Sequence, residues 1–273
     1  MEPFAASSAG FLRRRVGTYV AFFLLTLAVF MLSVRPVWAS SSSSSTMDLT
    51  SLTITPASGT VVFDPTTTTS EAFAQAQNSF GGFDQEYNSG LGTKVTSNAM
   101  TQFACGKAAA DPVNLVLNSY SNVNIPNEPI GFVAASSQGT ADIYNTNFMI
   151  TGGTGSVNVT FDSFLKWVQN LATNINGINA TSEVVFSLAI NGTQVLFLDS
   201  PLMVGSNASA SIENNNYELK NSTMLNYNED YEIYIETDAE SSGQSMPEPS
   251  TLALLFSGPA LAFGRRWIMA KRG

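Results

Sequence analysis

Residues 183–198 read EVVFSLAI-NG-TQVLFL, two runs of β-forming residues joined by Asn191-Gly192. Asn-Gly is the strongest short hairpin signal, because both positions of a tight hairpin turn require a positive φ that Asn and Gly tolerate. This stretch therefore predicts a β-hairpin, and it sets the expected fold class for the residues around it.

The residues on both sides of the hairpin carry similar β signals. Expected strands are 49–55, 59–63, 113–117, 130–134, 141–150, 156–161 and 231–237, separated by Pro, Gly and Asn. Weaker patterns predict strands over residues 71–110 as well. One short helix is allowed over residues 161–175, because apolar residues recur there at helical spacing after Asp162, a candidate N-cap.

These signals predict an all-β fold: a single antiparallel β-sandwich, jelly-roll-like, that forms one domain over residues 47–240. Polar segments flank this domain. Residues 40–46 include six consecutive serines and are expected to form a flexible lead-in. Residues 241–246 are expected to be a linker.

Composition excludes most familiar active sites. The chain has no His and a single Cys, Cys105, so the commonest general base and metal ligand, an intrachain disulfide and a multi-Cys metal site are all absent. Residues 40–246 carry four lysines, no arginine and nineteen acidic residues, a formal charge of −15. We expect no nucleic-acid binding, because that affinity comes mainly from clustered cations. We also expect no cofactor, no bound metal and no catalytic residue.

Residues 1–39 have the pattern of an export signal. Residues 13–15 are three arginines, residues 16–34 are uncharged and mostly apolar, and Val37 and Ala39 fit a signal-peptidase site with cleavage after Ala39. The apolar run could also nearly span a bilayer as an uncleaved signal anchor. In either case the arginines favour a cytoplasmic N-terminus with the following chain translocated. The expected partners are the Sec translocon and, for a cleaved signal, signal peptidase.

Residues 247–273 have a related pattern. Pro247, Glu248 and Pro249 precede an apolar segment, residues 251–264, which ends at a basic cluster, Arg265 and Arg266. As a helix the apolar segment would be about 21 Å long, which is short of a ~30 Å hydrocarbon core. The order of these features, with the string PEPSTLALL, resembles the PEP-CTERM sorting signal of Gram-negative bacteria.

The resemblance covers residues 246–267 and implies a route. In that family the tail holds an exported protein in the inner membrane until an exosortase, a membrane-embedded cysteine transpeptidase, cuts near the Pro-Glu-Pro motif and passes the protein to the cell surface or outside. Two features depart from the usual pattern: Pro259 interrupts the apolar segment, and seven residues follow Arg266. They bear on the membrane geometry of the tail.

For the domain itself, the favoured function is that of a non-enzymatic cell-surface or extracellular-matrix protein, associated with exopolysaccharide or biofilm. The alternative is a carbohydrate-binding β-sandwich, and a hydrolase would need a cleft with convergent carboxylates. The candidate sugar-stacking aromatics are Tyr144, Phe148, Trp167, Tyr217, Tyr227 and Tyr234. The acidic residues near the last strand are Glu229, Asp230, Glu232, Glu236, Asp238 and Glu240. They suggest a solvated acidic edge more than a Ca²⁺ site, because no Ca²⁺-loop spacing is present. Cys105 is expected to be a small buried apolar side chain.

Overall fold

Along most strands of this protein, successive side chains point alternately into the interior and toward the outer face. The computed structural model describes residues 39–64, 66–126, 132–174 and 177–246. Within these ranges the chain is all β, and there is no helix that could span a membrane. The strands are β1 (Ser41–Pro56), β2 (Thr60–Asp64), β3 (Thr69–Asn78), β4 (Phe83–Leu91), β5 (Val95–Met100), β6 (Ala104–Asp111), β7 (Val116–Ile125), β8 (Val133–Thr151), β9 (Ser156–Thr173), β10 (Gly177–Ile190), β11 (Thr193–Gly205), β12 (Ser209–Asn226) and β13 (Asp230–Ser245).

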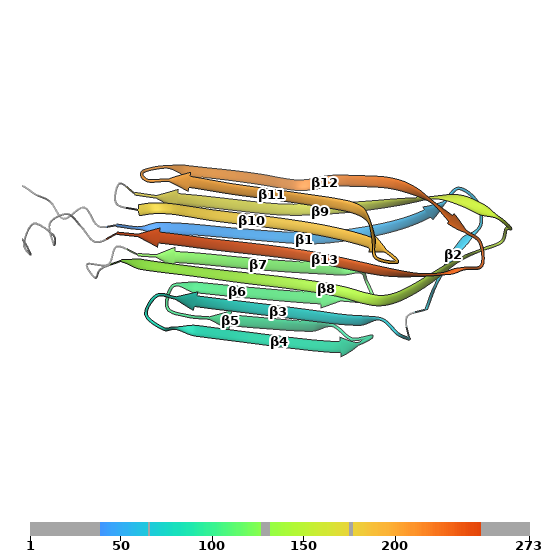
Figure 1. The fold of residues 1–273 in the computed structure, drawn as a ribbon, viewed down its shortest axis with the longest axis horizontal. Helices are drawn as coiled ribbons and strands as arrows, with labels where there is room; N and C mark the ends of the chain where they lie inside the picture. The colour runs from blue at the N-terminus through green and yellow to red at the C-terminus, as the bar shows by residue number, and fades with distance from the viewer. Residues whose placement is uncertain (1–38, 65, 127–131, 175–176, 247–273) are drawn as a thin grey trace, which may run out of the picture. The chain divides into compact units, whose positions relative to one another are not determined.

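Two antiparallel sheets lie face to face as a sandwich (Figure 1). One sheet has the order β12-β9-β1-β7-β6-β5, and the other has the order β11-β10-β13-β8-β3-β4, with β2 paired to β8. Strands stack in pairs across the interior, and β1 lies against β13. The first and last strands are therefore neighbours in the middle of the sandwich, and each is hydrogen-bonded to strands on both sides.

The predicted hairpin is confirmed. Strands β10 and β11 pair from Asn179–Gly205 to Ile190–Thr193. The two turn residues have positive φ, 47° for Asn191 and 75° for Gly192. This is the conformation that the Asn-Gly signal predicts.

The serine run forms the start of β1 and is an ordered part of the sandwich, so the prediction of a flexible lead-in is wrong. Ser41, Ser43 and Ser45 point inward and are buried. The hydroxyl of Ser41 donates to the carbonyl of Asn179 at 2.8 Å, and that of Ser45 donates to the carbonyl of Glu240 at 2.7 Å. Both carbonyls belong to the opposite sheet, so the buried hydroxyls find partners across the interior.

The hydrogen bonds between serines extend this contact between the sheets. The hydroxyl oxygens of Ser45, Ser121 and Ser241 lie 2.6–3.2 Å apart, and Ser119 donates to the carbonyl of Thr237 at 2.7 Å. Sheets separated by large apolar side chains lie about 10 Å apart, which is too far for a hydroxyl to reach the opposite main chain. In this half of the sandwich the sheets must therefore be closer.

Glycine and alanine keep this half of the interior narrow. A Cβ on Gly106 would lie 2.1 Å from the carbonyl oxygen of Gln138, and one on Gly139 would lie 2.0 Å from that of Lys107. The nearby buried cluster is mostly alanine, at positions 74, 76, 99, 104 and 135, and its larger members are Phe103, Val123, Ile125 and Val133. The two main chains are thus nearly in contact here, with no space for a larger residue.

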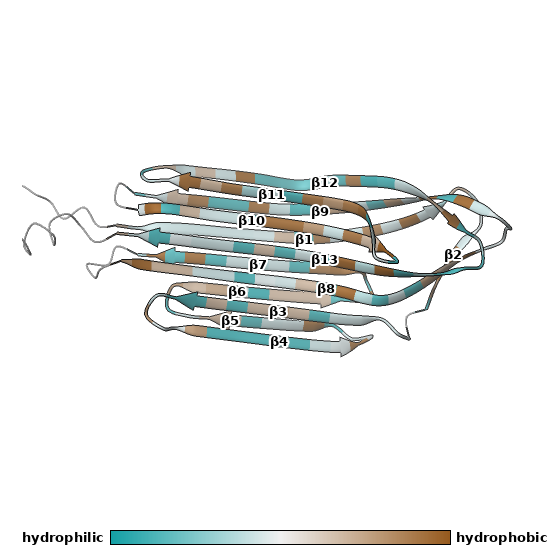
Figure 2. Cartoon of the chain, viewed as in Figure 1, coloured by the Kyte–Doolittle hydropathy of each residue, from teal (hydrophilic) through white to brown (hydrophobic). Residues whose placement is uncertain are grey.

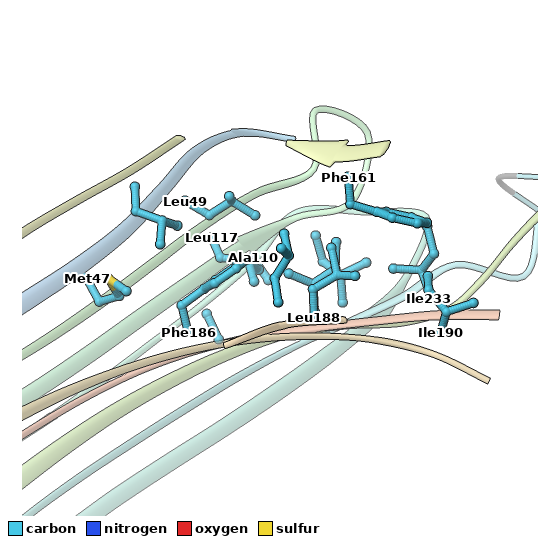
Figure 3. Close-up of a cluster of buried hydrophobic side chains, with 14 of the residues drawn as sticks. Met47, Leu49, Ala110, Leu117, Phe161, Phe186, Leu188, Ile190 and Ile233 are labelled. Carbon is cyan, nitrogen blue, oxygen red and sulfur yellow. The ribbon is translucent and has the colours of Figure 1, made fainter. Parts of the chain in front are cut away.

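The other half of the interior is filled by large apolar side chains (Figure 3). Leu49, Phe161, Phe186, Leu188 and Ile233 are fully buried and come from strands of both sheets. Aromatic contacts add to this packing, because the rings of Phe148 and Phe161 meet edge to face with centroids 6.4 Å apart. Burial of such side chains contributes about 1.5–3 kcal/mol each, so this half supplies most of the hydrophobic stabilisation.

Residues 161–175 do not form the helix that their spacing allowed. Residues 161–173 belong to β9, and residue 175 lies outside the described residues. Buried residues recur at every second position of this segment, 161, 163, 165, 167, 169, 171 and 173, while Phe164 and other residues between them lie on the outer face. Pairing with β1 on one side and β12 on the other fixes this segment as a strand, so tertiary pairing overrides the local periodicity.

Several expected boundaries also change. The expected linker, residues 241–246, is the end of β13 as far as Ser245, so the sandwich runs from Ser41 to Ser245 and not from 47 to 240. The strand expected at 113–117 begins only at Val116, because residues 112–115 form a turn whose amide N–H groups bond to Asp111. The strand expected at 130–134 begins at Val133, and residues 130–131 lie outside the described residues.

Because the sheets approach closely, we expect one added methyl group at Gly139 to change the free energy of unfolding strongly. We expect Gly139→Ala to lower the free energy of unfolding by at least about 2 kcal/mol, because its Cβ must push the main chain of Lys107 away. Gly205→Ala is the control, since a Cβ there meets no atom within 4 Å. Urea unfolding of the detergent-solubilised chain, followed by circular dichroism, measures both. Equal stability of the two variants would contradict the close approach.

Candidate binding face on the seven-stranded sheet

Charge is distributed unequally between the two sheets. The strands of the sheet that contains β13 carry twelve Asp or Glu and no Lys. The strands of the other sheet carry five acidic residues and three lysines, and Lys94 directly precedes β5. Lys220 pairs with Asp162 at 3.0 Å on that second sheet. The outer face of the seven-stranded sheet is therefore the anionic side of the described residues.

Carboxylates from separate strands meet in one row on this face. Glu236 of β13 pairs in register with Asp142 of β8, which pairs in register with Glu71 of β3. Directly paired side chains have Cβ atoms about 4.5–5.5 Å apart, and like charges at that distance repel. The row needs either protons or donors to stabilise it.

Tyrosine hydroxyls supply donors to this row. Tyr234 donates to Asp142 at 3.3 Å and to Glu236 at 3.2 Å. Tyr144 and Tyr87 both donate to the same oxygen of Glu71, Oε1. This bond, burial and the charge of Glu71 raise the pKa of Tyr144 to about 12, so its hydroxyl keeps its proton.

Two carboxyls on this face have pKa values well above the usual range of aspartate. Burial, followed by the charge of Glu236, raises the pKa of Asp142 to about 7. Burial also raises the pKa of Asp238 to about 7, although Thr140 donates to its carboxylate at 2.9 Å and opposes the shift. Near neutral pH this face therefore exchanges protons with the solvent.

A groove crosses this face next to the carboxylate row. Its volume is about 610 Å³, and it is lined by outward side chains from five adjacent strands, β3, β8, β13, β10 and β11. Two rows of paired residues form most of its floor: Gln75, Gln138, Glu240, Glu183 and Pro201 in one, and Gln77, Ser136, Ser242, Thr181 and Met203 in the other.

The groove presents hydrogen-bonding groups without a cation. Amides of three glutamines donate and accept, the hydroxyls do the same, and the carboxylates of Glu183 and Glu240 accept. The pKa of Glu183 is raised, by burial first and then by the nearby charges of Asp199 and Glu240. Such a lining suits a neutral ligand rich in hydroxyl groups and repels an anionic one.

The aromatic residues considered for sugar stacking do not form one platform. Tyr144 and Tyr234 lie on the anionic face, whereas Phe148 and Trp167 are buried in the interior. Tyr217 and Trp167 both belong to the six-stranded sheet, and their rings pack together with centroids 5.1 Å apart. The hypothesis that these aromatic residues together form a sugar-stacking platform is therefore wrong.

The acidic residues near the last strand divide into two groups. Glu236, Asp238 and Glu240 share the outer face of β13, while Glu229 accepts hydrogen bonds from Asn226 and Tyr231 at the turn before it. Among the described residues, no three acidic or thiol side chains are placed to hold a metal ion. Cys105 is half-buried, and burial raises the pKa of its thiol.

The sorting residues lie outside the described ranges, apart from Ala39. Val37, Pro247, Glu248, Pro249, Arg265 and Arg266 are not described. Ala39 is buried, and the amide N–H of Ser40 next to it donates to Oδ1 of Asn174 at 2.9 Å. Comparison with protein-family models, with curated proteins and with solved structures gave no match.

The raised pKa values predict how stability depends on pH. A carboxyl with a pKa near 7 in the folded chain and near 4 in the unfolded chain binds its proton more tightly when folded. The contribution of such a carboxyl to stability is therefore fully present below about pH 4 and is lost as pH rises to about 7, with little further change above. We expect Asp142→Asn to raise the free energy of unfolding at pH 8 by about 1–3 kcal/mol and to leave it nearly unchanged at pH 4.

Urea titrations at both pH values test this expectation. Glu213→Gln removes an exposed acid from β12 of the other sheet and should have no such pH-dependent effect. If Asp142→Asn destabilises the chain equally at pH 4 and pH 8, the carboxyl is not held protonated in the fold.

Proposed function

We propose that this chain is an exported, non-enzymatic protein of the cell surface or extracellular matrix of a Gram-negative bacterium. The observation that carries the proposal is the position of the chain ends. The described chain enters the sandwich at Ser41 and leaves it at Ser245, and β1 and β13 stack on each other in the middle of the two sheets (Figure 1). Both flanking segments therefore join the domain at the same end, which suits a domain displayed from a single membrane surface.

The flanking segments supply the route. The N-terminal signal directs the chain to the Sec translocon, and signal peptidase cuts after Ala39 or the segment stays as an anchor. The tail holds the protein in the inner membrane until an exosortase cuts near Pro247, Glu248 and Pro249. The protein then reaches the cell surface or the medium.

The charge of the domain agrees with that destination. An anionic face with no lysine stays hydrated and repels nucleic acid and other polyanions. These properties suit a structural component of a hydrated polysaccharide layer.

Intact mass after fractionation tests the route. In a Gram-negative host with an active exosortase, we expect the chain from the medium and cell surface to have lost residues from both ends. The triple variant Pro247→Ala/Glu248→Ala/Pro249→Ala should remain full-tailed in the inner membrane. The same host without its exosortase is the control for the wild-type chain. An uncut wild-type tail in every fraction would make the protein a permanent inner-membrane protein and would contradict sorting.

A second candidate function is glycan binding, and the groove on the seven-stranded sheet favours it. Its volume lies within the range of small-molecule and cofactor sites, about 300–1,000 Å³, and its amides and carboxylates can pair with adjacent sugar hydroxyls. Because no lysine faces the groove from the described strands, we expect a neutral glycan and not an anionic one.

Pull-down on insoluble polysaccharides tests the second candidate. We expect the exported protein to bind a neutral glucan and not alginate, and Glu183→Ala/Glu240→Ala to weaken glucan binding by about tenfold or more. Glu213→Ala/Glu218→Ala removes two exposed acids from β12 and should leave binding unchanged. Equal loss in both variants would contradict a role for the groove. Release of new reducing ends from the glucan would contradict the non-enzymatic proposal.

A further inference from the structure

The end of the sandwich where the chain enters and leaves carries a set of exposed apolar side chains. They are Phe80, Phe83, Met100, Phe132 and Met246, each at least half exposed. We call these five residues the apolar rim. Figure 2 shows apolar colouring where β4 and β8 begin, at the end where β1 begins and β13 ends.

Register places the members of the rim at this end. Ser245, which precedes Met246, pairs with Val133, which follows Phe132. Phe83 begins β4 opposite Gln77, near the end of β3. The rim thus joins four strand ends around the exit of the chain.

Hydrogen bonds hold the rim residues in their exposed positions. Oδ1 of Asn78 accepts from the amides of Phe80 at 3.0 Å and Gly82 at 3.1 Å. The amide of Ser79 donates to the carbonyl of Ala134 at 2.9 Å, and the amide of Ala134 donates to the hydroxyl of Ser79 at 3.2 Å. The loop that carries Phe80 is therefore tied to the start of β8, beside Phe132.

The second sheet completes the rim. The amide of Met100, at the end of β5, donates to the carboxylate of Asp84 at 2.8 Å, next to Phe83. The ring of Phe80 packs on that of Phe103, with centroids 6.0 Å apart. The rim is thus a fixed surface, and no Lys or Arg lies on it among the described residues. A large exposed apolar patch in a folded protein marks an interaction site.

Chain length identifies the partner. Val34, the end of the N-terminal apolar run, lies five positions before Ala39, and Thr251, the start of the C-terminal apolar segment, lies five positions after Met246. Even a fully extended chain of five residues reaches no more than about 18 Å. If either apolar segment is in a bilayer, the rim must lie close to the headgroup region, which extends several ångströms beyond the hydrocarbon core.

We propose that the apolar rim contacts the lipid bilayer while the chain is attached to it, with its phenylalanine and methionine side chains in the interface between headgroups and acyl chains. This inference rests on the membrane attachment given under the proposed function. The contact is apolar, so salt does not weaken it, in contrast to the binding of basic segments to anionic lipid. It also fixes the start of the tail, Pro247, at the membrane surface.

Fluorescence quenching in vesicles tests the proposal. The full chain is reconstituted into vesicles of phosphatidylethanolamine and phosphatidylglycerol that carry nitroxide-labelled lipid. Cys105→Ala removes the native thiol, and an environment-sensitive dye is attached through Phe132→Cys in the rim or Val113→Cys at the opposite end, where the side chain is also exposed. We expect the dye at position 132 to be quenched at least about fivefold more than the dye at position 113, at low and at high salt.

Two double variants keep the test specific to the rim. Phe80→Ser/Phe83→Ser should reduce quenching at position 132 to nearly that at position 113. Leu91→Ser/Met224→Ser, which changes two exposed apolar residues at the opposite end, should leave it unchanged. Circular dichroism checks that both variants are folded, as expected for exposed side chains.

Flotation of the vesicles separates the two proposals. Chain that floats, with equal quenching at the two positions, would overturn the rim contact and leave membrane attachment intact. Chain that does not float would overturn both. A third outcome would assign the rim to contact between two copies of the chain and would overturn the proposal. In that outcome, the dye at position 132 is not quenched in vesicles, and in detergent it becomes shielded from solvent as the protein concentration rises.

Discussion

Hydrogen bonds between serine hydroxyls of one sheet and main-chain carbonyls of the other are the constraint on which this structure depends. A hydroxyl reaches only a short distance, so the bonds from Ser41 and Ser45 hold β1 close to β10 and β13. Where the main chains of the two sheets come closest, at Gly106 and Gly139, only glycine fits. The largest cluster of apolar side chains lies toward the other end of the strands, where Phe148 and Phe161 meet. The inward side chains of β1 and β13 are therefore small at this end, from Ser41 to Ser45 and from Ala239 to Ser245, and larger and apolar toward the other end.

The second property of the fold is the separation of charge between the sheets. With no lysine in the strands of the seven-stranded sheet, the repulsion among Glu71, Asp142 and Glu236 is reduced by tyrosine donors and by proton uptake. The opposite sheet, which has lysines, can pair its acids, as Lys220 and Asp162 do. One face is thus acidic, hydrated and sensitive to pH near neutrality, and the groove that could hold a neutral glycan lies on the same face.

Local signals predicted only part of this arrangement. The turn at Asn191-Gly192 was predicted because its φ values depend on two neighbouring residues. The serine run was misinterpreted because the partners of its side-chain hydrogen bonds lie 76 to 196 residues away in the sequence. The same is true of β9, whose apolar spacing fitted a helix until pairing with β1 and β12 fixed a strand. Alternation could place Glu71, Asp142 and Glu183 on outer faces, but only the strand order brings them to the same face as Glu236 and Glu240.

The size of the apolar rim limits the strength of its contact with a membrane. Complete burial of one large apolar side chain contributes about 1.5–3 kcal/mol, so each of the five half-exposed rim side chains contributes at most about half of that on insertion. A free domain would lose at least about 4 kcal/mol on association, so its own affinity for a membrane would be weak. A domain tethered by five residues does not bear that cost again, and for it the same contact is favourable. In the proposed route, the rim orients the attached domain and places Pro247 at the membrane surface, while retention depends on the tail. In that route, cutting the tail releases the protein, because the remaining contact is too weak to hold it.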